Sequence, residues 1–312
     1  MVNILLELLI VILCLTALFF ITTFICFYLT FYVKTKDKIP PKYSLPLGNA
    51  YEPFKEKMVS LMKETENIPF KECVTKSFDG LTLYGKYYEY KKGAPIELMH
   101  HGYRGHCDRD LCGGVLRCFD LKRNCLLIDL RASGKSGGNV ITFGINESKD
   151  TLSWIDYIIN NIDKDAEIIL TGISMGASTV LMAGGENLPK NVTHIVADSG
   201  YTSAKEIIKK VIKQIHLPSS LVYPIIKLSA KIYGGFNLEE NSPIKAIENC
   251  KIPIIFFHGE EDGFVPCEMS KTHFNAYKNK KAILTVKGAD HGLCYLVDKE
   301  GYLKTIREFE KK

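Results

Sequence analysis

Residues 167–185 read EIILTGISMGASTVLMAGG, and this stretch decides the fold. An apolar run at 167–171 leads into Gly-Ile-Ser-Met-Gly at 172–176, and a helix-forming run follows at 177–183. A nucleophile elbow has this order of strand, sharp turn and helix, because the flanking glycines leave room for the strained turn and the serine oxygen stands exposed. The helix also directs its positive end toward developing negative charge. We therefore predict that Ser174 is a catalytic nucleophile.

A serine nucleophile needs a base, because an alcohol does not ionise unaided at neutral pH. His291 follows the strand-like run 282–286, lies between Asp290 and a glycine, and comes after Ser174 in the chain. This position predicts that His291 accepts the proton of Ser174. Four other histidines lack that position: His258 ends a strand beside a glycine, and His194, His216 and His273 are interpreted as structural.

The base needs a carboxylate that fixes its tautomer and stabilises the imidazolium. Asp262 follows the strand-like run 252–257, and the order Ser, Asp, His along the chain is the one expected. Glu260 and Glu261 are rivals for this role. We predict that Asp262 holds the second ring nitrogen of His291.

Further motifs carry a resemblance to a known family. His100-His101-Gly102-Tyr103 follows the apolar run 96–99, and Asp-Leu-Arg-Ala-Ser-Gly-Lys-Ser occupies 129–136. From about residue 72 to its carboxyl terminus the chain resembles the α/β-hydrolase family, and Asp262-Gly263-Phe264-Val265-Pro266 matches the family at the acidic position. The pattern at 198–203 and the amino-terminal anchor resemble the membrane-anchored bacterial and BEM46-like serine hydrolases. The resemblance implies a mostly parallel eight-stranded sheet with helices on both faces, and no cofactor.

The resemblance also implies where an oxyanion would bind. The backbone amide of Met175, just after the elbow, and that of Tyr103, in the loop after 96–99, would be the two donors. A shift of one residue would move the second donor to Gly102, and a side-chain role for Tyr103 or Arg104 stays open.

Strand-like and helix-like segments alternate along the chain, which predicts a mostly parallel, buried sheet. A hairpin at 73–78 and 81–90 is expected to open it, joined by Asp79-Gly80. The expected strands are 96–99, 125–129, 168–173, 194–197, 254–258 and 283–286, and the expected helices are 51–66, 111–122, 148–161, 175–186, 267–279 and 299–311. Residues 201–250 exceed a simple crossover and predict a helical cap over the nucleophile, with an acyl or lipophilic substrate.

The amino terminus predicts a membrane anchor. Residues 4–33 are almost continuously apolar and exceed the roughly 20 residues that a spanning helix needs. A cleaved signal peptide is the rival, but the run is too long, no basic segment precedes it and no cleavage site follows. We assign 1–34 to the anchor, 35–50 to an extended juxtamembrane linker that keeps the domain off the lipid, and 51–312 to the catalytic domain.

Lysines follow the anchor and none precedes it: they lie at 34, 36, 38 and 42. This bias predicts a catalytic domain on the cytoplasmic side. The net charge of +5 is spread among 35 acidic residues, without an arginine-rich stripe, so nucleic acid is not an expected partner. The partners we expect are the membrane and a small or lipid-like acyl substrate.

The ten cysteines include no Cys-x-x-Cys pair, and we expect reduced packing residues. Four of them, at 107, 112, 118 and 125, lie near His100, His101 and His106, but their spacing fits no ligand template, so no metal is expected. Gly134-Lys135-Ser136 is not a nucleotide loop, because Asp129 stands where that motif requires glycine.

Together these features predict an esterase or lipase-like serine hydrolase that works through an acyl-enzyme. A serine aminopeptidase-like peptidase and an acyltransferase would use the same residues. A binding protein without turnover is the fourth reading, and the intact motifs disfavour it.

Overall fold

The computed structural model describes residues 2–311, so Met1 and Lys312, the outer ends of the predicted anchor and catalytic domain, lie outside the described residues. Its centre is one eight-stranded sheet in the order β1-β2-β4-β3-β5-β6-β7-β8. The strands are β1 Lys71–Lys76, β2 Thr82–Tyr88, β3 Ile96–His100, β4 Asn124–Asp129, β5 Ile168–Ile173, β6 Val192–Asp198, β7 Ile254–Gly259 and β8 Lys281–Val286. Every predicted strand is present.

The first two strands form the expected antiparallel hairpin, and β2 also pairs antiparallel with β4. All other neighbours in the sheet are parallel. Strands β3, β4 and β7 are buried along their whole length, which explains why their apolar residues are not confined to alternate positions. The carboxyl ends of the parallel strands therefore meet at one edge of the sheet, where the site residues follow.

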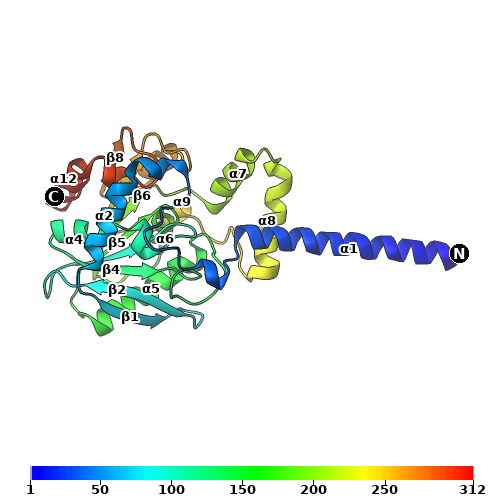
Figure 1. Cartoon of the computed structure of the whole chain (residues 1–312), viewed down its shortest axis with the longest axis horizontal. Coiled ribbons are helices and arrows are strands. Elements are labelled where there is room, and N and C mark those ends of the chain that lie inside the picture. The colour runs from blue at the N-terminus through cyan, green and yellow to red at the C-terminus, as the bar shows by residue number, and fades with distance from the viewer. Residues whose placement is uncertain (1, 312) are drawn as a thin grey trace.

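Helices cover both faces of the sheet (Figure 1). Helices α5 (Ile145–Asn161) and α6 (Met175–Gly184) pack together on one face, where Trp154 and Leu181 are fully buried. The other face is covered by α2 (Lys55–Glu66), α4 (Gly114–Asp120) and α12 (Lys299–Glu310). The shorter elements are η1 Thr35–Asp37, η2 Asn49–Phe54, α3 Cys107–Asp110, α9 Pro243–Ala246, α10 Glu268–Ala276 and α11 Cys294–Val297.

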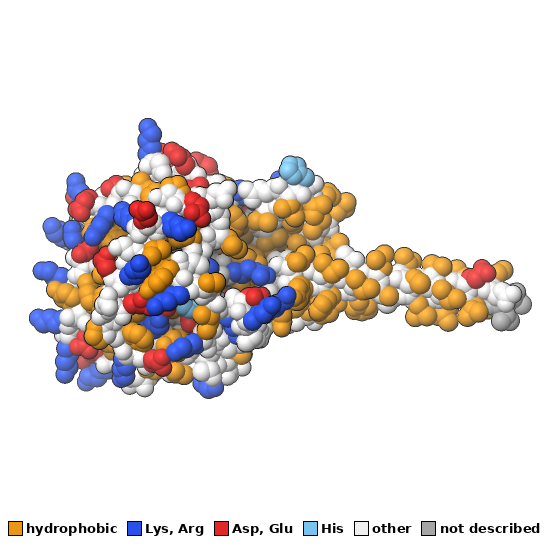
Figure 2. Space-filling view, in the orientation of Figure 1, with side chains coloured by type: hydrophobic (Ala, Val, Ile, Leu, Met, Phe, Trp, Pro, Cys, Tyr) orange, Lys and Arg blue, Asp and Glu red, His pale blue; other side chains and the backbone are white. Residues whose placement is uncertain are grey.

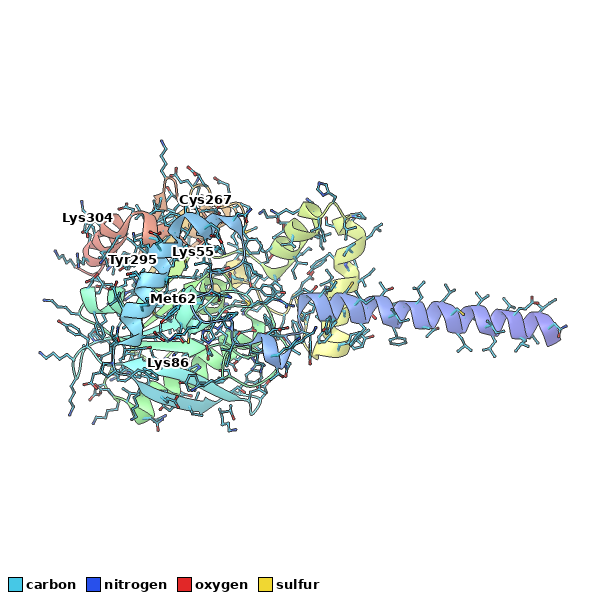
Figure 3. All side chains as sticks on the ribbon, viewed as in Figure 1. Lys55, Met62, Lys86, Cys267, Tyr295 and Lys304 are labelled. Carbon is cyan, nitrogen blue, oxygen red and sulfur yellow. The ribbon has the colours of Figure 1, made fainter. Side chains whose placement is uncertain are left out.

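The insertion after β6 is helical, as predicted, and consists of α7 (Ala204–Gln214) and α8 (Ser219–Gly234). It stands beside α1 (Val2–Thr30), which projects from the domain as a single long rod (Figure 1). Side chains along the outer part of the rod, toward the amino terminus, stand clear of every other element (Figure 3). Hydrophobic side chains cover the rod, whereas charged ones crowd the opposite end of the molecule (Figure 2).

The last turns of α1 belong to the folded domain. Phe27 and Phe31 are buried, and the Phe31 ring meets the edges of Phe143 at 5.7 Å and Phe236 at 5.4 Å. The chain then pairs with a domain loop, because the amide of Ile141 donates to the Phe31 carbonyl at 2.9 Å. The apolar run is thus divided into an exposed part and a part that packs like core.

The predicted linker packs on the surface of the domain. The amide of Gly134 donates to the Lys38 carbonyl at 3.0 Å, and the Lys38 ammonium donates to the Ser136 carbonyl at 3.1 Å. Farther along, Lys42 pairs with Glu66 of α2 at 2.7 Å. Two of the lysines that suggested a solvated spacer, Lys38 and Lys42, therefore have partners on the domain surface.

Candidate active site

The turn between β5 and α6 has the geometry of a nucleophile elbow. Ser174 stands at its tip with φ 58° and ψ −119°, a conformation that side-chain-bearing residues rarely adopt. A Cβ atom at Gly172 would lie 2.2 Å from the Gly176 backbone, and one at Gly176 would lie 2.2 Å from the His100 carbonyl oxygen. Both glycines are therefore required sterically, as the sequence motif suggested.

The structure brings two of the predicted partners together. His291, in the loop after β8, places its Nδ1 atom 2.7 Å from Oδ2 of Asp262, in the loop after β7. The rival glutamates do not make this contact: Glu260 accepts a hydrogen bond from the Thr285 hydroxyl at 2.7 Å, and Glu261 is exposed. Asp290 joins the two loops, because its Oδ1 accepts from the amides of Gly263 and His291.

Asp262 is held from every side. Its Oδ1 accepts from the amides of Phe264 at 2.9 Å and Val265 at 2.7 Å, and its side chain is fully buried. Burial alone would raise the pKa of the carboxyl, but hydrogen bonds from His258 and His291 outweigh it and hold the pKa below its ordinary value. Asp262 therefore stays ionised, as a partner for an imidazolium requires.

His258 is the residue that the sequence analysis missed. It ends β7, is fully buried, and places Nε2 2.8 Å from the Val265 carbonyl and 3.1 Å from Oδ2 of Asp262. Its Nδ1 lies 2.6 Å from the Ser270 hydroxyl. A proton on Nε2 lies within reach of both oxygens, so His258 supports the carboxylate. Its place four residues before Asp262, at a strand end, was the available signal.

Ser174 and His291 line one cavity of about 540 Å³, a size usual for small-molecule sites. Ser174 is 6% exposed, and the edge of the Phe264 ring lies against the His291 ring at a centroid distance of 5.1 Å. Among the hydrogen bonds of residues 2–311, none joins the ring to the Ser174 hydroxyl. Catalytic hydrogen bonds of this kind often tighten only when substrate binds.

The loop after β3 runs beside the nucleophile, as the family resemblance implies. A Cβ atom at Gly102 would lie 3.7 Å from the Ser174 hydroxyl oxygen. His101 ties this loop to the residue after β4, because its Nε2 accepts a hydrogen bond from the Leu130 amide at 3.0 Å. The amides of Tyr103 and Met175 remain our candidates for the oxyanion donors.

The side chains of Tyr103 and Arg104 bind the carboxyl-terminal end of α1. The Tyr103 hydroxyl donates to the Thr30 carbonyl at 2.8 Å. The Arg104 guanidinium donates to the carbonyls of Leu29 and Tyr32, each at 3.0 Å. The carbonyls of Leu29 and Thr30 lie in the last turn of α1, where a helix has no internal partners for them, so the candidate oxyanion loop caps α1.

The wall of the cavity is mostly apolar, and its apolar members include Met58, Met99, Leu111, Ile173, Phe264, Tyr295 and Leu296. Residues 46–51 form part of it, whereas no lining residue comes from 201–250. Among the described residues, the wall therefore includes residues 46–50 of the linker and Tyr51 of the domain in place of the predicted cap. The cap contacts the cavity wall from outside, because Lys210 of α7 donates to the carbonyls of two lining residues, Gly263 and Phe264, at 2.5 and 2.6 Å.

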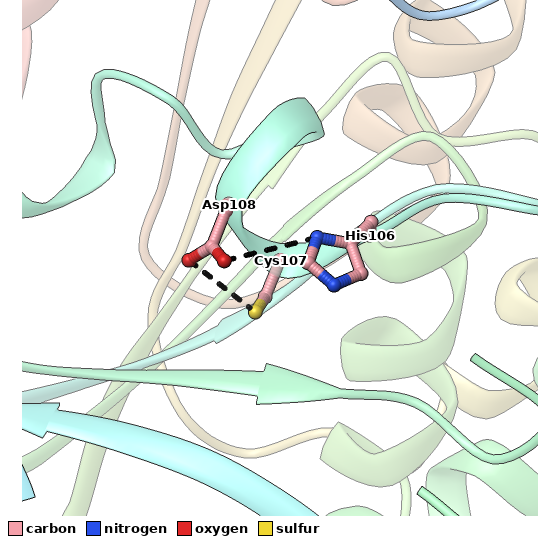
Figure 4. A group of neighbouring side chains, drawn as sticks. All are labelled: His106, Cys107 and Asp108. Carbon is pink, nitrogen blue, oxygen red and sulfur yellow. Dashed lines mark hydrogen bonds and ion pairs between the residues drawn. The ribbon is translucent and has the colours of Figure 1, made fainter. Parts of the chain in front are cut away.

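One group of potential metal ligands lies outside this cavity, at His106, Cys107 and Asp108 (Figure 4). The carboxylate of Asp108 is already paired with the Lys86 ammonium at 2.6 Å. Burial raises the pKa of the Cys107 thiol well above its ordinary value, which disfavours the thiolate that a metal would need. These contacts describe an ion-paired cluster, and we propose no metal there.

Solved structures share this architecture. The esterase Pf2001 of Pyrococcus furiosus superimposes with a TM-score of 0.65 at 21% identity, over 86% of this chain and 96% of that one. Est1E of Butyrivibrio proteoclasticus, solved with ferulic acid bound, gives a TM-score of 0.59 at 18% identity, over 77% and 100%. The chain has the α/β-hydrolase fold.

A curated bacterial protein is also similar in sequence. YqkD of Bacillus subtilis (strain 168), an uncharacterized protein, is 27% identical over 191 residues, which are 61% of this chain. The match spans 63% of YqkD, less than two thirds of its length. No family model matches the chain.

Proposed function

We propose that the chain is a membrane-anchored serine hydrolase that cleaves carboxylic esters through an acyl-enzyme. The observation that carries this proposal is the shared cavity of Ser174, on a strained elbow, and His291, whose ring is held by an ionised Asp262. A second, less specific support is that the structural neighbours include esterases.

In the proposed mechanism, the Ser174 oxygen attacks the ester carbonyl while Nε2 of His291 accepts its proton. Asp262 stabilises the imidazolium, and the amides of Met175 and Tyr103 bind the oxyanion. The imidazolium then protonates the departing alcohol. Water, activated by the same ring, attacks the acyl-enzyme and releases the acid.

The cavity supports a small or lipophilic acyl group as the substrate. Its wall is largely apolar side chains, and about 540 Å³ admits a short acyl chain or an aromatic acid. Amide cleavage, as in a serine aminopeptidase-like enzyme, and acyl transfer to an alcohol or amine use the same groups. Acyl transfer that exceeds hydrolysis when a nucleophile is added would identify the acyltransferase.

We further propose that α1 is an anchor rather than a cleaved signal, like that of the membrane-anchored, BEM46-like hydrolases. The lysines that follow it support a domain on the cytoplasmic side. The helix has the length and composition to cross a bilayer. Its end is built into the domain: removal would uncover Phe143 and Phe236 and leave Arg104 without its carbonyl partners. Digestion of the domain by protease added outside intact cells would contradict the orientation.

The test of the catalytic proposal is labelling with a fluorophosphonate probe, followed by a panel of acyl esters and aminoacyl amides. Wild type should label and hydrolyse esters, and Ser174→Ala should do neither. Ser60→Ala, which removes an exposed serine on α2, is the matched control and should behave as wild type. Labelling that persists in Ser174→Ala would refute the assignment.

A further inference from the structure

An apolar surface on the insertion has no role in the cavity. We define the cap patch as Ile215 and Leu217, in the turn between α7 and α8, with Leu221, Leu228 and Ile232 of α8. These five side chains are 60%, 46%, 68%, 39% and 42% exposed. They lie on the insertion next to α1, where Figure 2 shows hydrophobic side chains continuing from the rod onto the domain. Large exposed apolar patches mark interaction sites.

The patch has a helical pattern. Leu221, Leu228 and Ile232, with the half-buried Ile225 between them, are spaced four, three and four residues apart, so they form one face of α8. The opposite face is core, because Tyr223, Ile226 and Ala230 are buried. Helix α8 is therefore apolar on both faces, although only one of them is needed by the fold.

The exposed part of α1 fixes where a bilayer would lie. Residues 3–21 are all exposed, and 19 residues of α-helix span about 29 Å. This length matches a hydrocarbon core of about 30 Å. The bilayer surface on the domain side therefore falls close to Thr22, where α1 begins to be covered by protein.

Helix α8 contacts α1 at this level. The Tyr233 hydroxyl donates to the Phe20 carbonyl at 3.0 Å and lies 3.2 Å from the Thr23 hydroxyl. The Tyr233 ring also meets Phe24 at 5.5 Å and Phe27 at 5.6 Å. Since these contacts fall within residues 20–27, α8 sits within about 10 Å of the apolar boundary, at the depth of lipid headgroups.

We propose that the cap patch is a second membrane contact, which lies in the interfacial layer of the same bilayer that α1 spans. The continuity of the patch with α1 selects lipid as the occupant over a second copy of the chain. Tyr233 supplies an aromatic group with a polar end at the boundary, and the exposed Lys231 lies within reach of headgroups. The domain is then held on the membrane in one orientation instead of swinging on a tether.

The experiment uses tryptophan quenching by brominated phosphatidylcholine, with the full chain reconstituted in vesicles. The only tryptophan of the chain, Trp154 of α5, is fully buried in the core, so the fluorescence of wild type should not be quenched and gives the baseline. Leu221→Trp and Leu228→Trp report on the cap patch, and Phe19→Trp reports on α1. Lys304→Trp is the control, because Lys304 lies at the end of the domain opposite α1 (Figure 3).

Both cap variants and Phe19→Trp should lose most of the fluorescence that the added tryptophan contributes, whereas Lys304→Trp and wild type should lose none. Unquenched cap tryptophans together with a quenched Phe19→Trp would overturn the membrane contact and leave the anchor intact. If Phe19→Trp were also unquenched, the anchor itself would fail, and the proposal with it. Cap tryptophans that are blue-shifted but equally bright in plain and brominated lipid would indicate burial by a second protein copy and would also overturn it.

Discussion

Replacement of Asp262 by asparagine tests the proposed proton relay through the tautomer of one ring. The carboxylate Oδ1 accepts two backbone amides, from Phe264 and Val265, and Oδ2 accepts from Nδ1 of His291. An asparagine side chain has one oxygen for these two positions. Its oxygen should stay with the two amides, because turning it away would leave both amides unpaired, at a cost of about 1–3 kcal/mol each.

The amide NH₂ of Asp262→Asn then faces Nδ1 of His291 as a donor. The ring must present a lone pair there, so its proton moves to Nε2, the nitrogen that should accept the proton of Ser174. A base in the wrong tautomer costs about 10⁴ in kcat, or roughly 5.5 kcal/mol of transition-state stabilisation. We expect this loss in kcat, with KM little changed.

The assay is ester hydrolysis under steady-state conditions, together with the rate of fluorophosphonate labelling. Glu260→Gln is the matched control, because Glu260 binds the Thr285 hydroxyl and does not contact the ring. Circular dichroism of both variants confirms that they are folded. If folded Asp262→Asn kept kcat within about tenfold of wild type, Asp262 would not set the tautomer and the reasoning would fail.

Three further predictions concern stability and the anchored loop. Burial alone would raise the pKa of Glu97, but Arg117 and Arg123 lower it to about 2. The variant Glu97→Gln should therefore have a free energy of unfolding about 3–5 kcal/mol lower than wild type at pH 7, measured by denaturant unfolding. This difference should shrink as the pH falls from about 4.3 toward 2, where Glu97 takes up a proton. Burial lowers the pKa of His273 to about 3, and neither ring nitrogen has a hydrogen-bond partner within residues 2–311. The variant His273→Phe should therefore have a higher melting temperature than wild type. The gain should be larger at pH 5 than at pH 8, because below about pH 6.5 the histidine takes up a proton only in the unfolded chain, which destabilises wild type. An equal gain at both pH values would contradict this. Arg104→Met uncaps α1 and should lower the free energy of unfolding by about 1–3 kcal/mol, with reduced esterase activity; unchanged thermal scans and activity would show that the contact is dispensable.

The sheet and the elbow could be predicted because local sequence determines them. Buried parallel strands are short apolar runs between helical segments, and the glycines at 172 and 176 are fixed by close backbone approach. The pairing of Asp262 with His291 was also accessible, since parallel strands bring their carboxyl ends to one edge.

The remaining features depend on tertiary contacts that composition does not encode. Hydropathy cannot separate the exposed part of α1 from Phe27 and Phe31, because a protein core and a bilayer favour the same side chains. The linker looked like a solvated spacer, yet Lys38 and Lys42 have partners on the domain. His258 lacked the position of a catalytic base, and only the fold shows that a buried imidazole lies against Asp262.

The central claim is that Ser174 forms the acyl-enzyme, and the most direct measurement is mass spectrometry of the protein trapped with a fluorophosphonate. We predict one adduct per chain, on the peptide that contains Ser174, and no adduct when His291 is replaced by alanine. An adduct on any other residue, or labelling of Ser174 at an undiminished rate without His291, would contradict the account.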